Sequence, residues 1–172
     1  MHPLQIFLEE LDEGLLWELL DSKEEKNWNT ILVDYERPHV ERLWRQIGEN
    51  RIYLHTIHPC RADEAFFHFH PWPSIVRVIE GHYRMWLGVG HHNILAPPEE
   101  RIPLILAAGS EYEMLNPNQC HSVEPLEEPS RSIMVTGPPY RIGEQSKPPK
   151  QLSQLSALRK HELFIKTWLR SV

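Results

Sequence analysis

Hydrophobic and polar residues change their spacing twice along the 172-residue chain. In the first twenty residues, apolar side chains recur every three or four positions, which is typical of a helix that buries one face. These positions are Leu4, Phe7, Leu8, Leu11, Leu15, Leu16, Leu19 and Leu20. Carboxylates fill the opposite face. We therefore expect an N-terminal amphipathic helix with an interruption near Gly14.

A second short helix is predicted over residues 40–47, because the apolar residues of this segment share one helical face. These residues are Val40, Leu43, Trp44 and Ile47. Gly48 follows directly and can supply a left-handed C-terminal cap. Neither predicted helix carries residues typical of catalysis.

From residue 51 to residue 136, the spacing changes to short runs of strand-forming residues separated by proline, glycine and asparagine. The runs are Arg51–His58, Ala65–His70, Ser74–Glu80, His82–Val89, Ile102–Ala107, Glu111–Leu115, His121–Val123 and Ser132–Thr136. Eight strands in such a short stretch favour an antiparallel sandwich or barrel.

After Gly137, a polar and proline-rich stretch leads to a C-terminal helix. Its apolar stripe consists of Leu152, Leu155, Leu158, Leu163, Phe164, Trp168 and Leu169. This stripe must pack either on the barrel or on a second subunit. We expect a single domain in three parts, with a helical segment over residues 1–50, a barrel over 51–137, and the connection and helix over 138–172.

Composition narrows the classes of function. The formal net charge of −6 is spread along the chain, so a nucleic-acid partner is not expected. There is neither a signal-like start nor an apolar run long enough for a membrane span, so no membrane association is expected. Cys60 and Cys120 are too few for a disulfide framework, which favours a cytoplasmic location.

The most informative motif is a pair of histidines, His68 and His70, on an extended segment. Side chains two residues apart on a strand project from the same face, so the two imidazoles converge. A metal needs at least one further ligand from a neighbouring strand, and His121 is the natural third.

These histidines and the turns around them resemble the two motifs of the cupin superfamily. The first motif matches at Ala62, His68, His70, Ser74 and Gly81, and the second at Gly109, Asn116, Asn118, His121 and Pro125. The resemblance implies an all-β double-stranded β-helix, the jelly-roll or cupin barrel, with flanking N- and C-terminal helices. Asn118 stands where the motif has a turn glycine, a substitution that the left-handed region tolerates.

The main departure from the motifs is Ser74, because most metal-binding cupins have a carboxylate ligand at this position. Serine is a poor ligand, so His68, His70 and His121 would leave a dipositive metal its full charge and open positions. This arrangement resembles the three-histidine cupins, including thiol dioxygenases and some diketone-cleaving dioxygenases, which use iron. Fe(II) is the expected metal, and Zn, Ni and Mn are the alternatives.

Strand alternation identifies further pocket candidates, which are Trp72, Ser74, Val76, Tyr83 and Met85. If Ser74 faces inward, then Val76 does so too and Arg77 points outward. Trp72 lies between two prolines and either walls the pocket or closes the end of the barrel.

Two hypotheses from different classes follow. The leading one is a metal-dependent cupin enzyme that performs an oxygen-dependent reaction on a small organic molecule, although an isomerase or lyase would use the same ligands. The alternative is a non-catalytic barrel that binds a small ligand or acts in regulation. A structural zinc site ranks last, because Ser74 is a poor fourth ligand. By analogy with cupins, a homodimer is expected.

Overall fold

The computed structural model describes residues 1–11, 15–90, 97–140 and 153–168. Its larger sheet contains β1 (Asn29–Val33), β2 (Val40–Ile47), β3 (Asn50–Ile57), β10 (Ser130–Thr136), β5 (Ser74–Glu80) and β8 (Glu111–Met114), in this spatial order. The smaller sheet contains β4 (His68–Phe69), β9 (Gln119–Pro125), β6 (His82–Val89) and β7 (Arg101–Ala107). All pairings within the two sheets are antiparallel.

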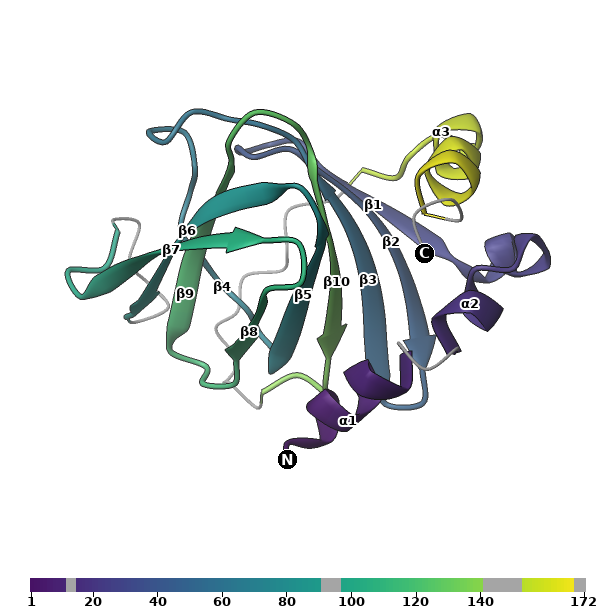
Figure 1. Ribbon diagram of the computed structural model, residues 1–172, viewed down its shortest axis with the longest axis horizontal. Coiled ribbons are helices and arrows are strands. Elements are labelled where there is room, and N and C mark those ends of the chain that lie inside the picture. Colours follow the sequence, from purple (N-terminus) through teal and green to yellow (C-terminus); the bar gives the residue numbers. More distant parts are fainter. Residues whose placement is uncertain (12–14, 91–96, 141–152, 169–172) are drawn as a thin grey trace.

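The two sheets form a β-sandwich of the jelly-roll kind, which confirms the expected all-β fold, although they do not close into a continuous barrel. The described helices are α1 (Pro3–Glu10), α2 (Leu16–Leu19), the 3-10 helix η2 (Ser22–Asn27), α3 (Ala157–Glu162) and the π-helical η3 (Leu163–Trp168). The α-helices lie on the side of the larger sheet that faces away from the smaller one (Figure 1). No helix in the described part of the chain has the length and hydropathy needed to cross a membrane.

The helix predicted over residues 40–47 is wrong, because this segment is strand β2. It pairs with β3 along its whole length through a two-residue turn at Gly48 and Glu49, where Gly48 has a φ of +58°. A tight hairpin and a helix cap both need a residue with positive φ, so one glycine fits both structures. The charged Arg42 lies on the inner face of β2, which disguised the alternation of a strand. The strand β1 was not predicted.

The N-terminal helices agree with the prediction, and the expected interruption near Gly14 lies outside the described residues. Helix α1 begins where the His2 side chain accepts a hydrogen bond from the backbone N–H of Leu4, with proline at the first helical position. Asn118 is not in the left-handed region, since positive φ angles occur only at glycines among the described residues.

A first core lies between the larger sheet and the helices. It includes Leu8, Leu43, Leu54, Ile75, Phe164 and Trp168. The C-terminal segment contributes to this core, where Phe164 meets Trp28 edge-on with the ring centroids 6.3 Å apart. The apolar stripe of the C-terminal helix therefore packs on this chain in part, although Leu158 is exposed. Leu152 and Leu169 lie outside the described residues.

A second core lies between the two sheets. Val78 of the larger sheet meets Tyr83, Met85 and Val123 of the smaller sheet there, and all four side chains are buried. This arrangement agrees with the predicted inward direction of β5 and β6 side chains. Residues on the inner faces of the two sheets consequently surround one interior space.

The turn between β5 and β6 depends on Gly81, which has a φ of +76° and where an added Cβ would lie 3.1 Å from the Cα of Ser130. We expect Gly81→Ala to lower the free energy of unfolding by about 2–3 kcal/mol, from left-handed strain and the steric contact together. Gly109→Ala is the matched control, because Gly109 also has positive φ but has open space around it. Urea unfolding should show a smaller loss for Gly109→Ala, and equal losses would contradict the steric argument.

Helix α3 is held to the larger sheet by Glu41, whose carboxylate accepts two hydrogen bonds of 2.6 Å from Arg159. Burial acts to raise the pKa of Glu41, but hydrogen bonds from Arg159 and His58 outweigh it and lower the pKa to about 2. The stabilisation is therefore fully present above the ordinary pKa of 4.5 and is lost as the pH falls towards 2.

Glu41→Gln is accordingly expected to cost about 1–2 kcal/mol of stability at pH 7, a figure reduced for the partial exposure of Arg159. The difference between the wild type and this variant should shrink steadily in denaturant titrations below pH 4.5. Glu127→Gln, at an exposed position, is the control and should leave stability unchanged. A pH-independent difference would contradict the assigned linkage.

Candidate metal centre

Two of the three candidate histidines lie opposite each other on neighbouring strands. His68 on β4 is in register with His121 on β9, and both belong to the smaller sheet. His70 follows β4 directly, just before the chain crosses to β5 in the larger sheet. The short strand β4 thus places both histidines of the His-x-His pair beside His121, as strand alternation predicts.

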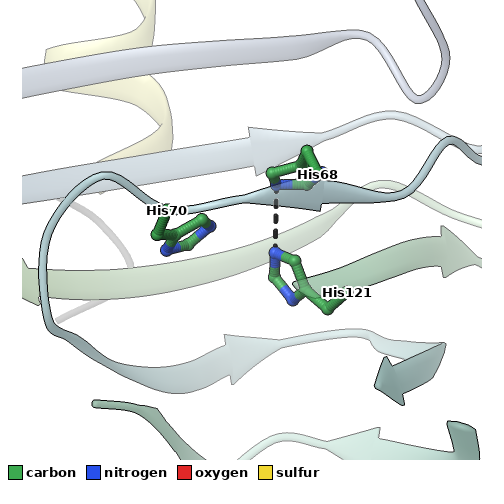
Figure 2. A group of neighbouring side chains, drawn as sticks. All are labelled: His68, His70 and His121. Atoms are coloured by element: carbon green, nitrogen blue, oxygen red, sulfur yellow. Dashed lines mark hydrogen bonds between the residues drawn. The ribbon is translucent and has the colours of Figure 1, made fainter. Parts of the chain in front are cut away.

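The three imidazoles converge closely (Figure 2). The Nε2 atoms of His68 and His121 are 3.0 Å apart, and one donor atom from each of the three residues lies within 4.8 Å of the others. His121 is buried, whereas His68 and His70 keep part of their surface accessible to a water-sized molecule.

Their surroundings keep all three imidazoles neutral. Burial, with a smaller contribution from the charge of Arg42, lowers the pKa of His68 to about 4. Burial also holds the pKa values of His70 and His121 well below the ordinary range. Because a metal binds the deprotonated ring nitrogen, the histidines are in the metal-binding protonation state at pH 7.

The donor set fits a divalent metal. Two nitrogens that are each about 2.1 Å from one ion, at right angles to each other, lie about 3.0 Å apart. The observed separation of 3.0 Å between the Nε2 atoms of His68 and His121 matches this value. One ring nitrogen of His70 lies within 4.8 Å of the donor atoms of the other two histidines and is the third candidate ligand.

Neighbouring side chains orient two of the rings. The hydroxyl of Ser74 is 2.9 Å from Nδ1 of His70, which leaves Nε2 of His70 as its donor atom. The thioether of Met85 lies 3.4 Å from Nδ1 of His121. Contacts to the second ring nitrogen set the tautomer and the direction of a ligating histidine. Ser74 therefore contacts a candidate ligand, at the position where the motif that the sequence resembles has a carboxylate.

Ser74→Ala is expected to lower the affinity for a divalent metal by about ten- to a hundredfold, because the His70 ring loses the group that orients it. Ser132→Ala is a suitable control, since Ser132 is also a buried serine of the larger sheet but contacts His55 rather than the cluster. Competition with a chromophoric chelator measures both affinities. Equal affinities would show that Ser74 does not position the ligand.

The other predicted pocket residues occupy different places. Val76 and Tyr83 are buried between the sheets, while Arg77 binds Glu111 on the outside. Trp72 stacks on Tyr53 at an interplanar angle of 9°. Trp72 also borders a surface cleft of about 250 Å³, which is lined in addition by Gln46, Glu49, Arg51, Thr136, Gly137, Pro138 and Pro139. This cleft does not include the three histidines.

Sequence reasoning missed two residues near the cluster, Arg42 and Tyr112. Arg42 was hidden by the helix predicted for β2. It is in register with His55 on β3, and the three-residue spacing of His55 and His58 predicts that only one of these two histidines can line the interior. Tyr112 lies 5.8 Å from the ring of His121, and burial raises its pKa to about 12.

Comparisons with known proteins give structural matches only. No family model and no curated protein matches the sequence. An iron(II) form of HppE superimposes with a TM-score of 0.51 at 14% identity, over 65% of this chain and 57% of that one. The hydroxypropylphosphonic acid epoxidase from S. wedmorenis superimposes with a TM-score of 0.50 at 17% identity, over 65% and 56% of the two chains.

This chain therefore matches less than three fifths of the length of these structures, and identities this low show a shared fold. The shared fold is a jelly-roll-like β-sandwich. The three histidines of the cluster are those that the sequence motifs led us to expect. The sandwich thus places three neutral imidazoles where a metal could be held.

Proposed function

We propose that this protein is a metal-dependent enzyme that binds Fe(II) through His68, His70 and His121 and performs an oxygen-dependent reaction on a small organic molecule. The convergence of three neutral imidazoles is the observation that supports this proposal most strongly. Iron is favoured over other metals that imidazole binds, because HppE, which shares the fold, has an iron(II) form.

The chain's own residues define what such a site can do. Three neutral ligands leave the charge of the ion undiminished, since Ser74 replaces the usual carboxylate. When bound, the ion would act as a Lewis acid and offer open positions for oxygen and substrate. Ser74 and Met85 orient the ligand rings, and buried apolar side chains between the sheets limit the access of water.

Fe(II) titration followed by nitric oxide, used as a surrogate for oxygen, tests this proposal. We expect one Fe(II) per chain and an electron paramagnetic resonance signal from one iron–nitric oxide complex per chain. Fe(II) binding without a reaction with nitric oxide would indicate a closed structural site. Failure to bind any divalent metal would instead leave a non-catalytic protein that binds a small ligand.

A further inference from the structure

The inner face of the larger sheet carries a positively charged side chain, Arg42, which has no role in the proposed function. One row of paired residues runs across four neighbouring strands of this sheet. It consists of Arg42 on β2, His55 on β3, Ser132 on β10 and Val78 on β5. Val78 packs between the two sheets. Residues in register across adjacent strands point to the same face, so Arg42 projects into the interior that contains the histidines.

The guanidinium of Arg42 has no protein partner among the described residues. Its Nε–H is buried and donates no hydrogen bond, and no ion pair formed by those residues includes Arg42. The titratable groups that act on Arg42 are the tyrosines Tyr35, Tyr53 and Tyr112, and no carboxylate is among them. Since an arginine stays charged in a protein, a buried guanidinium without a counter-ion is costly.

The positive charge of Arg42 faces the candidate metal centre. It contributes to the low pKa values of His55, His68, His70 and His121 and opposes the rise that burial causes in the pKa of Tyr112, so all five groups lie within its electrostatic reach. Arg42 keeps part of its side-chain surface accessible, as do His68 and His70. A small molecule beside the histidines would therefore meet a planar cation with unused donors.

We propose that Arg42 binds the anionic head group, a carboxylate or a phosphonate, of a small organic acid whose other end reaches the three-histidine cluster. A guanidinium forms paired hydrogen bonds with such oxyanions. A neutral ligand of the same shape binds a guanidinium less strongly. The aromatic residues Trp44 and Tyr53, in the next row of the same inner face, provide an apolar surface for the carbon skeleton. The identity of the substrate class rests on the proposed function, but binding of the anion to Arg42 does not.

The test therefore starts from metal-free protein, in which the neutral histidines contribute no net charge. Propionate and ethylphosphonate are the anionic probes, and propionamide is the neutral match for propionate. Wild-type protein should bind at least one anion about tenfold or more tightly than propionamide, and Arg42→Met should lose that preference. The anion that binds with the higher affinity shows whether the site prefers a carboxylate or a phosphonate. Equal binding of all three probes by the wild type would overturn the proposal.

Two further measurements separate ligand binding from a structural role. Arg42→Met should melt at the same or a higher temperature than the wild type, because it removes an unpaired buried charge. Its affinity for Co(II) should stay unchanged or increase, because a repulsive charge is lost. A marked fall in melting temperature or Co(II) affinity would assign Arg42 a structural role and contradict the proposal.

A measurement on the wild type alone covers the case in which Arg42→Met does not fold. The guanidinium N–H resonances of Arg42 should shift on addition of propionate or ethylphosphonate and remain in place with propionamide. No shift with either anion would overturn the proposal. Because these experiments need no metal, a failure of the Fe(II) titration would be recognised separately as a failure of the proposed function.

Discussion

Replacing His121 by alanine is expected to reduce the affinity for Fe(II) or Co(II) by at least about a hundredfold. The variant keeps only the donors of His68 and His70, which come from one segment of the chain. It loses the Nε2 atom of His121, which lies 3.0 Å from Nε2 of His68 on the neighbouring strand. Two imidazoles are too few to hold a divalent ion firmly in competition with water. Metal analysis after dialysis and isothermal titration give the stoichiometry and the affinity.

His82→Ala is the matched control for this experiment. His82 is exposed on β6 of the same sheet and does not belong to the cluster. Its replacement should leave one metal per chain. Circular dichroism should show that both variants keep the β-sheet signal. Undiminished binding by a folded His121→Ala variant would mean that the metal binds elsewhere or that His121 is only a packing residue.

Phe164→Ala is expected to lower the free energy of unfolding by about 3–5 kcal/mol, since it removes a fully buried ring from the core between the helices and the larger sheet. Leu158→Ala in the same C-terminal segment should change stability by less than about 0.5 kcal/mol, because Leu158 is 71% exposed. Denaturant unfolding at two protein concentrations checks both values.

The same comparison decides where the C-terminal helix packs. If Phe164 packs on its own chain, the loss of stability should not depend on protein concentration. A large loss that changes with protein concentration, or equal effects of Phe164→Ala and Leu158→Ala, would mean that this helix is held mainly by a second copy of the chain.

The strands around the histidines could be predicted well because local signals agree there. Ser74–Glu80 and His82–Val89 were predicted with the observed bounds, since alternation is regular and Gly81 marks the turn. The convergence of His68 and His70 follows from strand geometry alone. The approach of His121 is a long-range pairing, and the expectation for it came from the need for a third ligand on a neighbouring strand together with the resemblance to cupin motifs.

The larger sheet was harder to predict because both of its faces are covered, one by the helices and the other by the smaller sheet. On β2, Leu43 packs under the helices while Arg42 faces the interior, so a charged residue stands where an apolar one would reveal alternation. The hairpin turn at Gly48 was interpreted as a helix cap for the same reason. This misreading concealed Arg42 and its direction towards the interior.

The most direct test of the central claim is anomalous diffraction from crystals of the Fe(II)-loaded protein, recorded on both sides of the iron absorption edge. The expected result is one peak per chain at about 2 Å from a nitrogen of each of His68, His70 and His121. A structure of fully iron-exposed protein with no peak at this position, or with its peak on other residues, would contradict the assignment of these histidines as a metal centre.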